Sequence, residues 1–406
     1  MSCSQSDSSP YNPLYAQHRT VMVYMLAENS LSPFVAADVV EMLKGVKNQA
    51  FYPGDRLVIY LDDAALPRIY MLDRNTTASS MGQMEPVLTY SNDVNSASAQ
   101  QLGEFVNYVK THYPADSYGL VMWSHASGWI PSTYSGDYSA EARRRSFGVD
   151  NGENSPGKNV GNQMEVAQMA QALEEQGGVD FIFFDACFMQ TIEVAYQLRN
   201  AATQYVIGSP AEIPDLGSNY QTMVPAMFRQ DDYADAMLSA YYAEYGALTN
   251  WGLVVSAIHT PALPAFAASM RQWVEQERDA LLGANYKTVL NYFRYGYADR
   301  RQEQEGIKYE RWGTGYPDFY DMQGVMLNSL SSDDMARWLD EVDGVVQCMH
   351  ADRWYSGKMG GMTTYPIDSE QCCGVSMFLP LAKYDDDGKN FNASFEQTDW
   401  AQKVWK

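Results

Sequence analysis

Six short apolar segments, which alternate with helical patterns, constrain the fold of this chain more than any other feature. They are "TVMVYMLA" (20–27), "RLVIYLDD" (56–63), "YGLVMWSH" (118–125), "DFIFFDAC" (180–187), "YVIGSPAE" (205–212) and "GLVVSAIH" (252–259). Their near-continuous apolarity is typical of strands that are buried on both faces of a largely parallel sheet. Strands that alternate with helices predict an α/β/α sandwich with a mostly parallel central sheet.

Two of the intervening helices have recognisable starts. Ser98 and Gln101 have the spacing of a capping box, and so do Asn162 and Glu165. Apolar residues follow each pair at helical spacing, so each helix has one face to bury.

The pattern changes after about residue 260. Long helical segments such as 332–350 appear, and one further strand, "GVSMFLP" (374–380), ends the series. We therefore divide the chain into a disordered N-terminal tether (1–18), an α/β domain (19–260) and a helix-rich C-terminal region (261–406) that packs on it.

The acidic composition excludes one class of partner. The formal charge is −22, from 50 acidic and 28 basic side chains. Such a surface repels phosphate backbones, so nucleic acid is not an expected partner. The charge either serves only solubility or also attracts cationic peptides and proteins. No apolar run approaches the roughly 18 residues that a membrane span needs.

The cysteines, histidines and acidic runs give no metal motif. There is no C-x-x-C pair, and the histidines are far apart in sequence, so we assign no metal ligand. Acidic runs at 61–65, 230–236 and 383–390 could supply hard oxygen ligands for calcium, but they lack the EF-hand spacing and are read first as solvated surface. Cys348 is expected either to form a disulfide with Cys372 or Cys373 or to lie with them as buried thiols.

The N-terminal stretch "MSCSQSDSSPYNP" raises two alternatives. Cys3 followed by a Ser/Gln/Asp/Pro-rich tether is typical of a mature bacterial lipoprotein, in which that cysteine carries the lipid. The other reading is a disordered tail with an incidental cysteine. The first reading predicts a secreted, periplasmic or cell-surface protein that touches the membrane only through a lipid on Cys3.

Reactive side chains follow two of the predicted strands. One strand ends at Ser124–His125, and another ends at Asp185–Ala186–Cys187. Catalytic residues of open α/β sheets collect at such carboxyl ends. We expect Cys187 to lie just before a helix N-terminus, where the dipole favours a thiolate, and His125 to accept the thiol proton. Either residue alone is more often structural, but together they favour a Cys–His dyad.

Asp185 lies two residues before the cysteine. In a strand, residues i and i+2 share a face about 6–7 Å apart. A carboxylate there is too far away to deprotonate the thiol in line but is well placed to hold a cationic group of a substrate. The alternative is a capping or salt-bridged aspartate.

At these positions the chain resembles the clostripain family of cysteine peptidases, which belongs to the same clan as the caspases. "WSHASGW" (123–129) and "FDACFMQ" (184–190) match the family's two catalytic blocks, and family-like segments extend from about residue 19 onward. The resemblance implies a caspase-like fold for residues 19–260. It also implies that His125 is the general base and acid and that Cys187 is the nucleophile.

The resemblance further implies roles for the residues around this pair. The backbone N–H groups of Ala126 and Cys187 would form the oxyanion hole. Asp185 matches the acidic residue of the specificity pocket, which implies cleavage of peptides and proteins after Arg, with Lys as a second candidate. We expect Asp215 to supply a second pocket carboxylate. The family usually has Gly where this chain has Ala126, and a positive φ there would strain an alanine.

Two other properties of the family concern processing and metal. Family members are often cut by themselves between the two blocks, and "SAEARRRSFG" (139–148) offers Arg143, Arg144 and Arg145 in that interval. The alternative for these arginines is a solvated basic turn. Some members bind calcium, although no cofactor is required for the dyad.

The sequence therefore predicts a secreted or surface-anchored cysteine endopeptidase with a preference for basic residues. One rival reading is a catalytically weak or inactive caspase-like surface module that binds glycans or peptides, which Ala126 alone favours. The other rival is a peptidase that acts chiefly on itself or on one partner.

Overall fold

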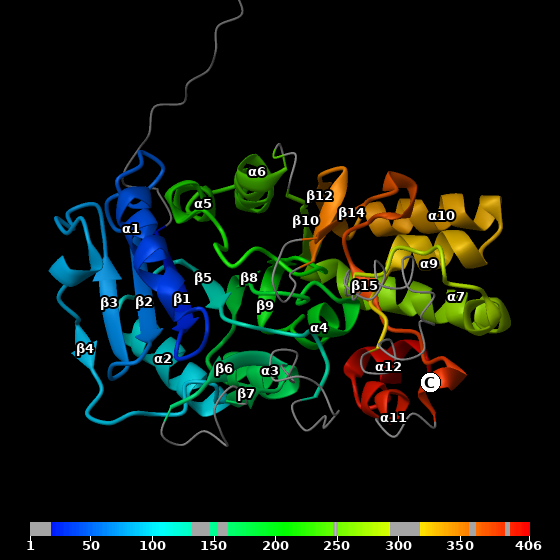
Figure 1. Cartoon of the computed structure of the whole chain (residues 1–406), viewed down its shortest axis with the longest axis horizontal. Coiled ribbons are helices and arrows are strands. Elements are labelled where there is room, and N and C mark those ends of the chain that lie inside the picture. The colour runs from blue at the N-terminus through cyan, green and yellow to red at the C-terminus, as the bar shows by residue number, and fades with distance from the viewer. Residues whose placement is uncertain are drawn as a thin grey trace, which may run out of the picture.

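The protein is built around one large sheet covered by helices on both faces, as the computed structural model in Figure 1 shows. The structure describes residues 18–131, 146–152, 161–246, 248, 251–292, 317–356, 363–385 and 390–406. Within these residues, nine strands form the central sheet, in the order β12-β10-β9-β8-β5-β1-β2-β3-β4. Their bounds are β1 (Arg19–Leu26), β2 (Arg56–Asp62), β3 (Arg68–Leu72), β4 (Leu88–Thr89), β5 (Ser117–Trp123), β8 (Val179–Asp185), β9 (Ala202–Gly208), β10 (Val254–His259) and β12 (Val346–His350).

The five central strands are parallel, and the outer ones are antiparallel. The pairs β1–β2, β1–β5, β5–β8 and β8–β9 are parallel, whereas β3, β4, β10 and β12 pair antiparallel with their neighbours. All six apolar segments of the sequence lie in this sheet. The prediction of a mostly parallel central sheet is therefore confirmed.

Two apolar cores lie on the two faces of the sheet because successive strand residues point to opposite sides. In β1, Met22 and Tyr24 belong to one core, and Val21 and Val23 belong to the other. Helices α1 (Val35–Gly45), α5 (Tyr220–Met227) and α6 (Tyr233–Tyr245) bury their apolar residues in the second core. Helices α2 (Ala99–His112), α3 (Val166–Glu175) and α4 (Ile192–Gln197) belong to the first core.

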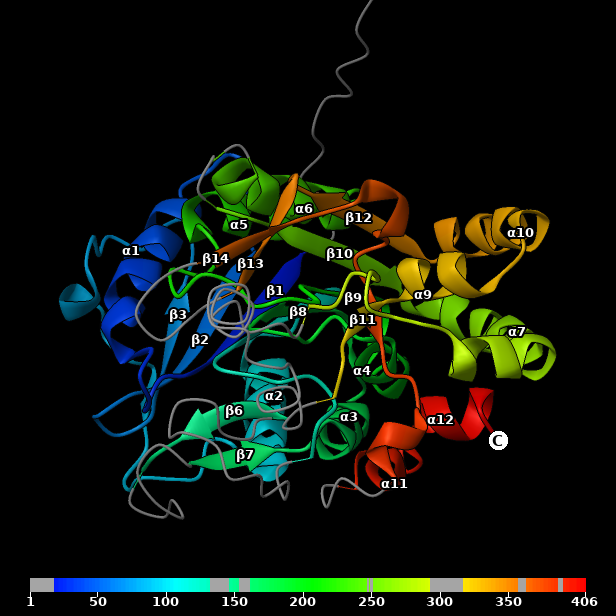
Figure 2. The same cartoon turned by 45° about the vertical axis from the view of Figure 1, so that its right-hand side comes forward.

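The C-terminal helices extend beyond the β10–β12 end of the sheet, in both Figure 1 and Figure 2. These helices are α7 (Leu263–Gly283), α9 (Met322–Ser329), α10 (Ser332–Asp343), α11 (Phe391–Phe395) and α12 (Asp399–Val404). Their buried residues continue the first core without a break. The region from residue 261 is thus rich in helices, as predicted, and it also contributes β12 to the sheet. The boundary at residue 260 stays a prediction.

Three small antiparallel pairs complete the described structure: β6 (Phe147–Asp150) with β7 (Asn162–Met164), β11 (Tyr320–Asp321) with β15 (Ser376–Met377), and β13 (Arg353–Ser356) with β14 (Thr363–Pro366). The predicted strand at 374–380 is β15, which has only two residues and lies outside the central sheet.

Two helix predictions need correction. The helix predicted for 332–350 ends at Asp343, with Gly344 as its C-cap, and residues 346–350 form β12. Glycine after a helical run is a stop signal, and the β-branched residues beyond it favour a strand. Asn162 does not cap α3, because it lies in β7 and Glu165 occupies the N-cap position. The Ser98 cap of α2 is confirmed, since its side chain accepts a hydrogen bond from Gln101 N.

The cysteines of the C-terminal region are free thiols. Cys348, Cys372 and Cys373 form no disulfide with one another, and the last two are buried. The buried-thiol alternative therefore describes these residues. Cys3 lies outside the described residues, and no described helix is long and apolar enough to cross a membrane.

Candidate active site

The parallel pairing of β5 with β8 brings the two predicted catalytic residues to the same edge of the sheet. Trp123, the last residue of β5, lies opposite Asp185, the last residue of β8. His125 and Cys187 each follow two residues later. Both are partly exposed, whereas the strand residues before them are buried.

The loop after β1 orients the imidazole of His125. Ser30 Oγ lies 2.7 Å from His125 Nε2, at hydrogen-bonding distance. Asn29 holds this loop in place, because its Nδ2 donates to Leu26 O and to Val149 O, each at 2.8 Å. No pattern in the sequence indicates a role for Ser30 or Asn29, although both closely follow the first buried strand.

Cys187 lies in a tight turn and not at a helix N-terminus. Helix α4 begins at Ile192, with Thr191 as its N-cap, so the expected stabilisation of a thiolate by the helix dipole is wrong. A backbone amide donates to the sulfur, because Ile213 N–H points to Cys187 Sγ at 3.4 Å. A donated N–H favours a negatively charged sulfur over a neutral one.

The turn contains a residue with unusual backbone geometry. Phe188 has φ 61°, the left-handed region that a bulky side chain rarely adopts. Its N–H donates to Ala211 O at 3.0 Å, and its ring packs against Phe319 with centroids 5.7 Å apart. These contacts hold the chain in a conformation that the sequence by itself disfavours.

Gly128 makes room for this turn. Its φ is +70°, and a Cβ there would lie 2.9 Å from both Phe188 O and the Phe319 ring. The glycine of "WSHASGW" is therefore required by close contact with the segment that follows the cysteine.

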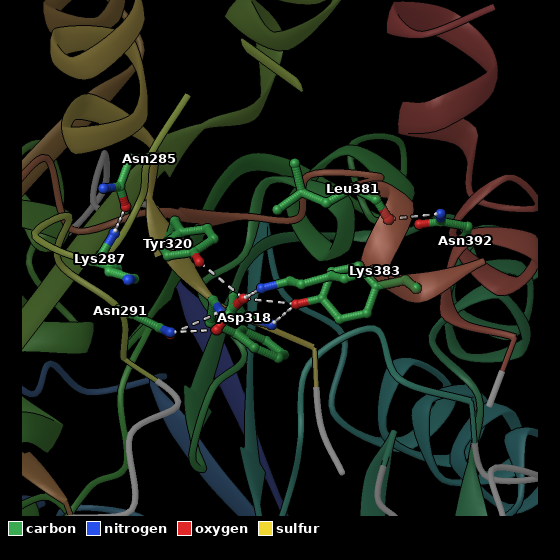
Figure 3. A network of polar contacts seen from close by, with 10 residues as sticks. Asn285, Lys287, Asn291, Asp318, Tyr320, Leu381, Lys383 and Asn392 are labelled. Atoms are coloured by element: carbon green, nitrogen blue, oxygen red, sulfur yellow. Dashed lines mark hydrogen bonds and ion pairs between the residues drawn. The ribbon is translucent and has the colours of Figure 1, made fainter. Parts of the chain in front are cut away.

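A polar network around Asp318, the residue before Phe319, fixes the position of this segment. Figure 3 shows the side chains of Asn291, Tyr320 and Lys383 converging on Asp318. Asn291 Nδ2 donates at 2.6 Å and Tyr320 Oη at 2.9 Å, and Lys383 forms an ion pair with the same carboxylate. Burial opposes ionisation of Asp318, but Lys383 and the hydroxyl donors outweigh it, so the pKa of Asp318 is below its ordinary value. The C-terminal region thus fixes the turn of Cys187.

The closing segment supports the same turn. Ser376 N donates to Gln190 O at 3.1 Å, and Phe378 N donates to the buried carboxylate of Glu193 at 2.8 Å. The residues between Cys187 and α4 are therefore held by chain that lies almost two hundred positions later.

Ala126 is not strained. Among the described non-glycine residues, only Phe188 and Asn390 have positive φ. Ala126 forms an antiparallel bridge with Phe147 that uses Ser127 N to Ser146 O (3.3 Å) and Gly148 N to His125 O (2.8 Å). In such a pair the N–H of Ala126 itself points away from β6. The replacement of glycine therefore has no cost in backbone conformation.

Asp185 is buried on the side of the sheet that faces α5. Its side chain accepts hydrogen bonds from Tyr220 Oη at 2.7 Å and from Ser218 N at 3.1 Å, and the residue is only 4% exposed. Burial raises the pKa of Asp185 to about 6, although these two donors oppose the increase. Ser218 N also donates to the other carboxylate oxygen of Asp185 at 3.2 Å, so both oxygens accept hydrogen bonds within the fold.

Asp215 lies in the loop after β9 and is exposed. Tyr355 of β13 interacts electrostatically with both Asp215 and the cysteine. No pattern in the sequence indicates this tyrosine. Burial raises the pKa of Tyr355, and the negative charges of Asp215, Glu212 and Cys187 raise this pKa further. Tyr355 therefore lies within electrostatic range of both Asp215 and Cys187. Arg143, Arg144 and Arg145 lie outside the described residues.

The model of the clostripain family matches residues 23–347. The chain belongs to the clostripain family. Clostripain from Hathewaya histolytica is 27% identical over 212 residues, which cover 48% of this chain and only 38% of that protein. The chain thus matches well under two thirds of the length of this curated relative.

Two solved structures are similar over almost the whole chain. An inactive zymogen of a C11 protease from Parabacteroides distasonis has a TM-score of 0.76 and 24% identity, with 96% of this chain and 99% of that chain covered. A secreted C11 cysteine protease from Bacteroides thetaiotaomicron, in complex with an irreversible peptide inhibitor, has a TM-score of 0.73, 27% identity and the same coverage. The predicted family, fold and enzyme class, a cysteine protease, are confirmed.

Gly128→Ala is expected to lower the free energy of unfolding, because a left-handed conformation costs an alanine roughly 1–2 kcal/mol and the contact with Phe188 O adds to this. Chemical denaturation would measure the change. Gly82→Ala in the 3-10 helix Met81–Gln83 is the matched control, because a Cβ there meets nothing within 4 Å. Equal losses in the two variants would contradict the packing role of Gly128.

Proposed function

We propose that this chain is a cysteine endopeptidase that hydrolyses peptide bonds after Arg, and more weakly after Lys, through a dyad of His125 and Cys187. The observation that supports it is the register of β5 and β8, which sets both residues two positions beyond a paired strand end. Family membership adds the enzyme class.

The proposed reaction begins with proton transfer from Cys187 to His125. The thiolate attacks the carbonyl carbon of the scissile bond, and the negative oxygen of the tetrahedral intermediate is stabilised by the N–H groups of Ala126 and Cys187. His125 then protonates the leaving amine, and the acyl group stays on the sulfur. A water molecule, deprotonated by His125, releases the acyl group and regenerates the thiol.

The substrate preference is proposed to come from carboxylates beneath and beside this pair. Asp185 would bind the guanidinium of the residue before the scissile bond, and the exposed Asp215 would attract it at the rim. A planar guanidinium can bind a carboxylate through two hydrogen bonds, which a lysine ammonium cannot match, so Arg is favoured.

Two further parts of the proposal concern maturation and location. Self-cleavage would occur after Arg143, Arg144 or Arg145, between the two catalytic blocks. The protein would act outside the cytoplasm, as the similar secreted protease does, with a lipid on Cys3 as its only membrane contact. The alternative of an inactive binding module was favoured only by the replacement of glycine with Ala126. Because Ala126 has no positive φ, this replacement gives no reason to expect a damaged site.

The main test is an assay of the reduced, purified chain on fluorogenic peptides that differ only in Arg, Lys or Ala before the reporter. We expect turnover in the order Arg, Lys, Ala, and a loss of at least about 10³-fold in kcat/KM for Cys187→Ala or His125→Ala. Cys348→Ala removes a thiol in β12 and serves as the control that retains activity. Absence of turnover together with a Cys187 that resists iodoacetamide would refute the proposal.

The role of Asp185 predicts a pH dependence of ligand binding. As pH falls through about 6, Asp185 becomes protonated and loses the charge that holds a guanidinium. In the Cys187→Ala background, the affinity for an Arg-containing peptide should therefore fall by about tenfold between pH 7 and pH 5, as measured by calorimetry. Asp185→Asn should bind weakly at every pH, whereas Asp215→Asn should keep the dependence. An affinity that stays constant across this range would exclude Asp185 as the binding group.

Self-processing predicts a defined pair of fragments. Incubated wild type should separate into two pieces cut near Arg145, which mass spectrometry would locate, and Cys187→Ala should stay intact. Replacement of Arg143, Arg144 and Arg145 by Gln should also prevent the cut. The fluorogenic assay on this variant would show whether the uncut chain is active. Cleavage of Cys187→Ala incubated alone would instead indicate a contaminating protease.

A further inference from the structure

One loop joins the proposed nucleophile to the buried carboxylate of Asp185. Residues 211–218, which we call the pocket loop, follow β9. Ile213 N–H points to Cys187 Sγ at 3.4 Å, and Ser218 N donates to both oxygens of Asp185, at 3.1 and 3.2 Å. The pocket loop is therefore fixed at both ends of the region where the side chain before the scissile bond would lie.

The pocket loop carries two acidic side chains, of which Glu212 is partly exposed and Asp215 is exposed. Asp185 is only 4% exposed, and its oxygens already accept hydrogen bonds within the fold. A guanidinium has five N–H donors, and each needs an acceptor when water is removed. Asp185 by itself cannot supply all of these acceptors, so further acceptors are expected nearer the rim.

Tyr355 of β13 brings a hydroxyl to this rim. The residue is only 7% exposed, and its hydroxyl forms no hydrogen bond with any residue that the structure describes. Burial and the negative charges of Asp215, Glu212 and Cys187 raise the pKa of Tyr355, so the hydroxyl stays protonated at neutral pH. A buried polar group without a partner requires an explanation. The three acidic neighbours favour a cationic group with N–H donors as its partner.

A row of aromatic side chains holds Tyr355 in place. Its ring stacks on Trp251, with centroids 5.9 Å apart and an interplanar angle of 19°, and Trp251 packs on Tyr245 at 5.5 Å. Tyr245 packs in turn on Tyr241 at 5.7 Å, and its hydroxyl donates to Gly217 O in the pocket loop. The row therefore connects β13 with the pocket loop and sets the position of the Tyr355 hydroxyl beside that loop.

We propose that the Tyr355 hydroxyl accepts a hydrogen bond from the guanidinium of the substrate residue before the scissile bond. Its role rests on the proposed function, in which Asp185 binds the same group. Tyr355 would donate its own proton to Asp215 or Glu212, so that the hydroxyl joins the cation to a carboxylate at the rim. The five N–H donors of Arg spread over a plane, whereas the three of Lys point from one nitrogen. A lysine that contacts Asp185 can bind without Tyr355, so this hydroxyl favours Arg over Lys.

The test compares the affinities of matched Arg and Lys peptides for the full chain with Cys187→Ala, measured by calorimetry above the pKa of Asp185. Tyr355→Phe removes only the hydroxyl from this parent. The Kd of the Arg peptide should rise about tenfold in this variant, because a hydrogen bond to a charged group is lost. The Kd of the Lys peptide should change by less than about threefold, because Lys does not use this acceptor.

Trp251→Leu tests the support of Tyr355 and keeps the hydroxyl itself. The preference for the Arg peptide should also fall in this variant, whereas Trp251→Phe, which keeps a ring for Tyr355 to stack on, should retain most of it. Tyr242→Phe is the matched control, because it removes the hydroxyl of an exposed tyrosine of α6 and should leave both affinities unchanged.

The outcomes separate the role of Tyr355 from the proposed function. Equal affinities of the parent and Tyr355→Phe for the Arg peptide would overturn this role, while turnover of Arg peptides by the wild type would still support the proposed function. Equal losses for the Arg and Lys peptides would also overturn it, because the hydroxyl would then contact a part common to both peptides. A selective loss for the Arg peptide would support the role of Tyr355 even in a chain without turnover.

Discussion

The parallel pairing of β5 and β8 is the interaction on which the rest of the site depends. A slip of one residue would exchange the two faces of β8 and move Phe183 and Phe184 into the wrong cores. Because both cores are fully packed, the register is fixed by burial on both sides of the sheet. This register sets the relative position of His125 and Cys187, since each lies two residues after the last paired residue of its strand.

The sequence was sufficient for the features that depend on local pattern. Buried strands are recognisable because their apolar residues are contiguous, and the pair of strand-end residues follows from the topology of a parallel sheet. The start of α4 was misplaced because the turn of Phe188 depends on Phe319 and Ala211, which are distant in sequence. Ser30 and Tyr355 approach the site from other elements, and no periodicity in their own segments could indicate that. The reading of 61–65 as solvated surface is wrong for Asp62, which has no exposed surface, because its burial comes from tertiary packing.

The C-terminal region has a direct part in the geometry of the nucleophile. A left-handed phenylalanine persists only where surrounding contacts outweigh its strain. Here these contacts come from Gly128 in the histidine block and from Phe319, which the Asp318 network holds (Figure 3). The two short catalytic blocks of the family are thus held in their geometry by residues that lie outside both blocks.

The position of β12 has a consequence for self-association. Its residues pair with β10 from Val254 to Ile258, so the backbone groups on that side of β10 are satisfied within the chain. A second copy could not add a strand to β10 without displacing β12. At the opposite edge, β4 has only two residues and offers little to pair with. Among the described strands, the outer side of β12, a five-residue strand, is therefore one edge at which a second sheet could pair.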